Sequence, residues 1–184
     1  MANRSYLYST NVVPDHHAAP AERKRIGISE WAWDTPLVYR LLLSGNPRTC
    51  PSTIWNLPEE IAIVGDYAQG VEKLRAFLSR ITLPDAQPMI AEALAFLDDT
   101  DNQQTWLVLE SGELYDMEDD DMAQLNARML ASIEQVDQDA EAMLTALQPG
   151  YRGGPDSAHQ TSEEALAELG LDNWSNVLYF DLTD

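Results

Sequence analysis

Basic residues and cysteine are scarce in this chain. Its 184 residues include 11 Lys and Arg against 31 Asp and Glu, which gives a formal net charge of −20. Cys50 is the only cysteine, so no disulfide can form within the chain, and this usage is typical of a reducing compartment. No apolar run approaches the roughly 20 residues that a membrane-spanning helix needs, and the N-terminus has no secretory pattern. We therefore expect a cytoplasmic protein.

The acidic charge is unevenly distributed. Residues 1–80 hold nine basic and eight acidic side chains, a net charge of +1, whereas residues 81–184 hold two basic and 23 acidic side chains, a net charge of −21. Such a field repels nucleic acid and anionic membranes and attracts basic proteins. We therefore expect no nucleic-acid or membrane partner. The same charge is also a solubility feature, and composition alone does not separate the two roles.

Apolar residues are plentiful. They make up 45% of the sequence and include five Trp and seven Tyr. This is enough for a sizeable core, and the length suits one domain. The sequence predicts a single α+β domain over residues 1–184, with helices packed on a small mixed or antiparallel sheet.

Four segments have strand-like patterns. SYLYS (5–9) alternates with a two-residue period, and IAIV (61–64) resembles a short buried strand. TWLVLESGELYDM (105–117) is typical of a hairpin, because Gly112 supplies the backbone freedom that a tight turn needs. NVLYFDL (176–182) predicts a closing strand, which we expect to pair near SYLYS so that the N- and C-terminal strands share one sheet.

Helix signals are stronger. They predict helices over 34–47, over 65–84 with Asp66 as cap, and through 89–97 after Asp85. A fourth short helix is expected after Thr161. Apolar residues at helical spacing also predict one long acidic helix over about 119–147, roughly 40 Å in length. Pro149 and Gly150 end it, and about 148–160 then resembles a linker.

The stretch LYDMEDDDMAQLN (114–126) has two interpretations. Acidic residues stabilise a helix N-terminus, and one of Glu118, Asp119 and Asp120 is then the expected cap. Alternatively, the acids form a binding surface. That surface would comprise the residues Glu118, Asp119, Asp120, Asp121, Glu134, Asp137, Asp139 and Glu141. Only Arg128 opposes them in this stretch, and like charges along a helix cost stability, so a basic partner is one candidate for offsetting that cost.

Metal and catalytic motifs are weak. Asp99, Asp101 and Glu110 fall at calcium-loop spacing, but Gln104 stands where such a loop needs Gly. The other possible metal ligands, which fit no zinc spacing, are His16, His17, His159 and Cys50. No phosphate-binding loop or nucleophile motif is present. We predict no metal, no cofactor and no catalytic residues.

A second hypothesis places a small-molecule pocket in the near-neutral half. Aromatic residues gather there in sequence, and one or two of them are candidates to line a pocket with a polar anchor. The candidate ligand-binding residues are Trp33, Tyr39, Arg40 and Tyr67. This alternative makes the chain a ligand-binding domain or an enzyme.

Three motifs carry a resemblance. N-R-S-Y-L-Y (3–8), I-S-E-W…P-L (28–37) and I-V-G-D-Y-x-x-G-V (63–71) resemble a family of bacterial proteins of unknown function. The likeness covers about the first 80 residues and, more loosely, the closing segment. It implies no functional residue. In size and acidity alone the chain is also similar to immunity proteins, which neutralise secreted toxins, and this implies a basic, nuclease-type toxin as partner. We therefore expect a non-enzymatic interaction protein that binds through its acidic face.

Overall fold

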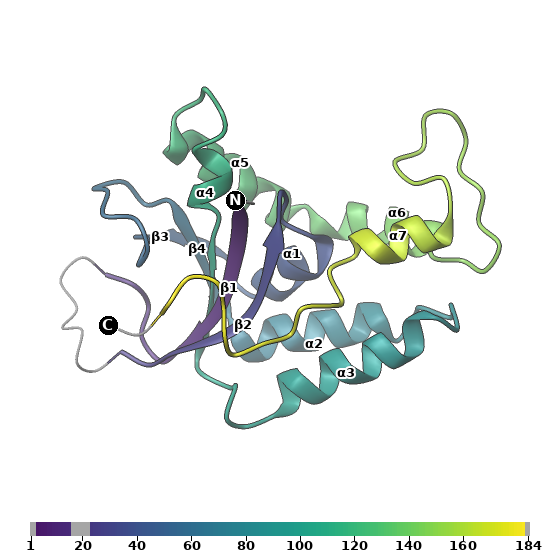
Figure 1. The fold of residues 1–184 in the computed structure, drawn as a ribbon, viewed down its shortest axis with the longest axis horizontal. Coiled ribbons are helices and arrows are strands. Elements are labelled where there is room, and N and C mark those ends of the chain that lie inside the picture. The colour runs from purple at the N-terminus through teal and green to yellow at the C-terminus, as the bar shows by residue number, and fades with distance from the viewer. Residues whose placement is uncertain (1–2, 16–22, 183–184) are drawn as a thin grey trace.

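An antiparallel sheet forms the centre of the computed structural model, which describes residues 3–15 and 23–182 (Figure 1). Its five strands are arranged in the order β2-β1-β5-β4-β3, and every neighbouring pair is antiparallel. The strands are β1 Arg4–Thr10, β2 Arg25–Ala32, β3 Arg48–Cys50, β4 Ala62–Asp66 and β5 Trp106–Glu110. The chain is therefore α+β, as predicted, and the sheet is antiparallel rather than mixed.

Seven helices connect or follow these strands in the described part of the chain. They are α1 Leu37–Leu43, α2 Tyr67–Leu78, α3 Ala86–Asp98, α4 Gly112–Tyr115, α5 Met122–Glu134, α6 Val136–Ala146 and α7 Ser162–Glu168. Two predicted caps are confirmed: the Asp66 carboxylate accepts from the Gln69 N–H at 2.9 Å, and Thr161 accepts from the Glu164 N–H at 3.2 Å. These local signals succeed because a cap involves residues only three apart.

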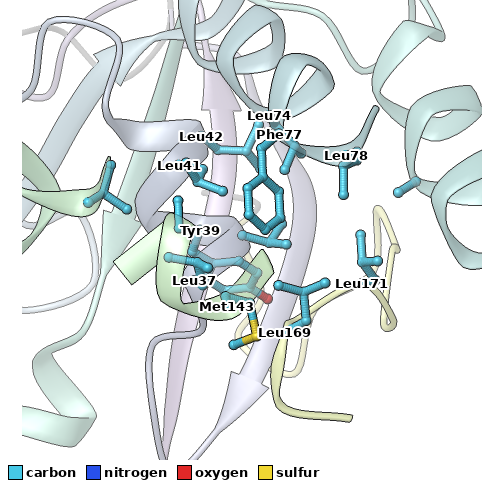
Figure 2. Packing of buried hydrophobic residues seen from close by; sticks show 14 of the residues in the cluster. Leu37, Tyr39, Leu41, Leu42, Leu74, Phe77, Leu78, Met143, Leu169 and Leu171 are labelled. Atoms are coloured by element: carbon cyan, nitrogen blue, oxygen red, sulfur yellow. The ribbon is translucent and has the colours of Figure 1, made fainter. Parts of the chain in front are cut away.

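Both faces of the sheet are buried, and β1 shows how. Leu7 faces the main core, where it joins side chains from α1, α2, α3 and α6. Figure 2 shows the part of this core formed by α1, α2 and α6. Its neighbours Tyr6 and Tyr8 point to the opposite face and contribute to a smaller cluster with Val108 and Leu178. The two-residue alternation of SYLYS therefore separates two apolar cores, not core from solvent.

The closing segment covers that second face without forming the predicted strand. Residues 176–182 have no strand structure, although Phe180 packs on Tyr6 with ring centroids 6.1 Å apart. Hydrogen bonds that involve side chains attach this segment to β2 in place of strand pairing. Asn176 Nδ2 donates to the Gly27 carbonyl at 2.9 Å, and the Glu30 carboxylate accepts from the Tyr179 N–H at 2.6 Å. The predicted aromatic contact is present, but the strand prediction was wrong: β1 has no free edge for a further strand, because β2 and β5 occupy both of its edges.

The predicted hairpin over 105–117 was also wrong. Its first half is β5, the central strand, which pairs with β1 on one side and β4 on the other. Both edges are thus occupied, and no returning strand can join. The chain turns into α4 instead, where buried Tyr115 contacts the Asn126 side chain of α5 at 3.1 Å.

The long acidic helix over 119–147 is two helices. α5 ends at Glu134 and α6 begins at Val136, because Gln135 has a non-helical backbone with φ −105° and ψ 12°. Ile133 and Val136, on either side of the break, are both buried in the main core. The sequence did not reveal it, since the apolar spacing continues through Gln135 without Gly or Pro.

Two glycines of the I-V-G-D-Y-x-x-G-V motif allow close packing. A Cβ added at Gly70 would lie 1.8 Å from the Leu42 carbonyl oxygen, and one at Gly65 would lie 2.5 Å from the Leu43 carbonyl oxygen. Any side chain at these positions would force α1 away from β4 and α2. The motif therefore has a structural explanation.

Candidate functional site

Residues 116–121, here called the acidic loop, connect α4 to α5 and are all exposed. The helix cap is Asp121, whose carboxylate accepts from the Gln124 N–H at 3.1 Å, so the predicted cap at 118–120 was wrong. Asp120 pairs with Arg128 at 2.6 Å. Glu118 and Asp119 have no side-chain partner among the described residues. Their charges are therefore available to a partner.

An apolar side chain lies within this acidic loop. Met117 is 47% exposed and has Asp116 and Glu118 as its chain neighbours. A single exposed apolar side chain is common on protein surfaces, but Met adapts its shape readily to a partner. The loop thus combines an apolar group with a rim of carboxylates.

The remaining predicted acids lie elsewhere. Asp139 accepts from Arg40 of α1 at 2.5 Å, and both oxygens of Glu141 accept from the Arg80 guanidinium, which lowers the pKa of Glu141. Glu134 and Asp137 are exposed beside them, at the junction of α5 and α6. The fold therefore supplies two cations that no local pattern indicated, since Arg40 is 99 residues from Asp139.

The eight predicted acids consequently form two groups. The 13 residues of α5 span roughly 20 Å and separate the group at 118–121 from the group at 134–141. Asp137 and Asp139 also lie in the first turn of α6, where the helix dipole stabilises negative charge. The negative charge of the second group is thus largely compensated within the protein, by two arginines and by the helix dipole.

The four residues of the predicted aromatic pocket do not converge. Tyr39 and Tyr67 are buried, and their hydroxyls donate to Ser29 Oγ at 2.7 Å and to the Leu97 carbonyl at 2.9 Å. Trp33 is 61% exposed and follows β2 with a positive φ of 71°. Arg40 and Tyr67 line two separate cavities: that of Arg40 lies against α6 and residues 151–159, and that of Tyr67 lies between α2 and the end of α3.

Sequence reasoning missed a buried polar network at the end of β5. Glu110 is 1% exposed and accepts from Ser52 Oγ at 2.6 Å and from the Thr53 N–H at 2.7 Å. Burial raises the pKa of Glu110, while these hydrogen bonds oppose the increase. All of these donors come from the connection after β3, so the carboxylate anchors that connection to the sheet.

The possible metal ligands are not gathered into a site. Within residues 3–15 and 23–182, no group of three or more His, Cys, Asp or Glu is placed to hold a metal ion. Two of the candidate zinc ligands, His16 and His17, lie outside the described residues. In the same ranges, no helix has the length and apolar character required to cross a membrane.

Comparison with known proteins places the chain in a family. A family model described as "Domain of unknown function (DUF7822)" matches residues 11–150. The chain belongs to this family. The family's matched region includes the two resembling segments at 28–37 and 63–71 and also the acidic loop, whereas the opening motif at 3–8 and the closing segment lie outside it. No curated protein and no solved structure matches the chain significantly.

Proposed function

We propose that this chain is a non-enzymatic bacterial protein of the cytoplasm that binds a basic partner protein through the acidic loop. One observation supports this most strongly. Exposed Met117 lies among carboxylates of which Glu118 and Asp119 have no partner in the described part of the chain. Protein interfaces often combine an apolar centre with a charged rim. Met117 would supply buried area, and the carboxylates would supply attraction and orientation.

The charge of the whole chain supports a basic partner over other kinds. The net charge is −20, so the field accelerates encounters with cationic surfaces and slows encounters with anionic ones. A basic toxin of the nuclease type is the partner class that we favour, because its substrate-binding surface must attract phosphate and would equally attract carboxylates. The protein would then act as an immunity protein or inhibitor.

The compensated group at 134–141 has a smaller role in this proposal. Arg40 and Arg80 already satisfy Asp139 and Glu141, so a partner would have to displace an internal cation to use them. Surface ion pairs contribute little stability, and replacing one with another gains little. Glu134 and Asp137 add to the long-range field only.

Capture from a lysate of the native host tests the proposal. The tagged protein is presented at low salt and at about 0.5 M salt, where exposed charges are largely screened. We expect a basic protein to be retained at low salt, and we expect its binding to be weaker at high salt. The same capture with Met117→Ala should lose that protein even at low salt. Retention by Met117→Ala and wild type alike, or no basic protein at either salt, would contradict the proposal.

The small-molecule alternative depends on a different part of the structure. The predicted aromatic pocket is not assembled, but the cavity beside Arg40 gives this alternative a specific location. Ligand binding there would not depend on the acidic loop.

A further inference from the structure

A cavity of about 520 Å³ lies between α1, α6 and the segment that links α6 to α7. Small-molecule sites in proteins commonly have volumes of about 300 to 1,000 Å³. Its mouth faces solvent, because Ala142 and Thr145 of α6 line it and are exposed. The cavity is therefore large enough for a small ligand and accessible to one.

The linking segment forms an ordered wall, although the sequence suggested a linker. The Gly153 N–H donates to the Gln160 carbonyl at 3.0 Å, and the Gln160 side chain donates back to the carbonyls of Gly154 and Ser157. These contacts join parts of the long loop that projects between α6 and α7 (Figure 1). A wall held by its own hydrogen bonds forms the cavity before any ligand arrives, which lowers the entropic cost of binding.

The floor of the cavity is apolar. Leu37 and Met143 are at most 8% exposed, and they lie side by side at the edge of the main core (Figure 2). Ala146 adds a further buried methyl group, and half-buried Tyr151 contributes an aromatic wall. This part of the cavity suits an apolar side chain and offers no compensation to a buried charge.

A pair of opposite charges lines the same cavity. Arg40 Nη1 and Asp139 Oδ2 are 2.5 Å apart, and their side chains are 20% and 55% exposed. A guanidinium has five N–H donors and a carboxylate has two acceptor oxygens. Asp139 is the one partner of Arg40 among the described residues, so most of these donors, and one carboxylate oxygen, remain for a ligand. Adjacent sites for an anion and for a cation therefore lie beside the apolar floor.

The ligand's charge can be inferred from the surroundings. The net charge of −20 disfavours an anion, and Arg40 reduces the attraction of Asp139 for a simple cation. A zwitterion carries no net charge and can satisfy both partners at once. In an α-amino acid the ammonium and carboxylate are joined through a single carbon, which matches two side chains that are themselves in contact.

We propose that this cavity binds a free α-amino acid with a large apolar side chain. Arg40 contacts its carboxylate, Asp139 contacts its ammonium group, and Leu37 and Met143 receive the side chain.

Isothermal titration calorimetry with four probes tests this on the unmodified protein. L-Tryptophan carries both charges, tryptamine lacks the carboxylate, indole-3-propionate lacks the ammonium group and glycine lacks the side chain. We expect L-tryptophan to bind about tenfold or more tightly than each of the other three, because each loses one charge-assisted contact or the apolar contact. Equal binding of the three indole compounds would overturn the proposal, and so would no binding of L-tryptophan up to about 10 mM.

Variants locate the site. Arg40→Met should remove the advantage of L-tryptophan over tryptamine, and Asp139→Asn should remove its advantage over indole-3-propionate. Ala142→Trp should weaken the binding of L-tryptophan about tenfold or more, because the new ring occupies an exposed position in the mouth of the cavity. Arg128→Met is the matched control, since it breaks a similar ion pair with Asp120 far from this cavity. Unchanged binding in Ala142→Trp, or a loss in Arg128→Met equal to that in Arg40→Met, would place the ligand elsewhere.

Discussion

The carboxylate of Asp121 accepts a hydrogen bond from the backbone N–H of Gln124 at 3.1 Å, and this contact begins α5. The acidic loop therefore has two components. Asp121 has a structural role as the helix cap, and Asp120 pairs with Arg128. Glu118 and Asp119 have neither role among the described residues, which is why they carry the proposed binding function.

This division predicts different stability effects within one loop. Asp121→Ala should lower the free energy of unfolding by about 1 kcal/mol, because a helix cap is lost. Asp119→Ala should change it by less than about 0.5 kcal/mol, since its side chain is exposed and has no described partner. Urea unfolding of both variants measures the difference. Equal destabilisation by the two substitutions would mean that the cap has been assigned to the wrong residue.

Gly70 should tolerate no side chain. Gly70→Ala is expected to cost at least about 2 kcal/mol, because its new Cβ would overlap the Leu42 carbonyl oxygen and separate α1 from α2. Gly154→Ala is the control: its nearest atom would be 3.9 Å from the new Cβ, so the change should stay within about 0.5 kcal/mol. Thermal unfolding of the two variants checks the packing of α1. Similar melting temperatures for both would contradict the packing described for the I-V-G-D-Y-x-x-G-V motif.

Glu110 should make stability depend on pH. Burial raises its folded-state pKa above the ordinary value of 4.5, so ionisation is more costly in the folded protein than in the unfolded chain. Stability is therefore lost as pH rises from about 4.5 through the raised pKa, and it is regained on acidification. Lowering the pH from about 7 to 5 should stabilise the wild type relative to Glu110→Gln, which cannot ionise. A difference between the two proteins that stays constant with pH would show that Glu110 does not titrate in this range.

Cys50 should be unreactive in the native protein. It is 2% exposed, and burial together with nearby Glu110 raises the pKa of the thiol, so little reactive thiolate forms. A chromogenic disulfide reagent at pH about 8 should label the protein in urea and leave the native protein unlabelled over the same time. Native labelling as fast as in urea would show that the thiol is accessible and would reopen a role for it.

The correct predictions from the sequence concern features that depend on neighbours in the chain. The caps at Asp66 and Thr161 and the fold class were correct, because both follow from local residue types and periodicity. β2 was missed, although its eight residues make it the longest strand, because it begins at the basic Arg25 and contains Gly27. An added Cβ at Gly27 would lie 2.7 Å from the carbonyl oxygen of Asn176 in the closing segment. The break at Gln135 and the neutralisation of Asp139 by Arg40 depend on contacts between distant segments, which periodicity does not encode.

The candidate sites also depend on contacts between distant segments, which the sequence does not show. The acidic loop was visible as a run of like charges, but only the structure separates the cap at Asp121 from Glu118 and Asp119, which have no partner among the described residues. The four predicted pocket residues do not share a cavity, because Tyr39 is buried in the core, Tyr67 lines a different cavity, and Arg40 shares its cavity with Leu37 and residues 139–159.

A comparison of partner affinity between two charge-reversal variants tests whether the acidic loop is the binding surface. The affinity of the captured partner is measured for the wild type, for Glu118→Lys with Asp119→Lys, and for Glu92→Lys with Asp101→Lys. Both double variants raise the net charge by four, and the second pair is exposed on and beyond α3, at the opposite end of Figure 1. We expect at least about a tenfold loss of affinity for the first variant and a much smaller loss for the second, because like charges at an interface repel the partner directly. Equal losses would mean that net charge alone attracts the partner and that the acidic loop is not the binding surface.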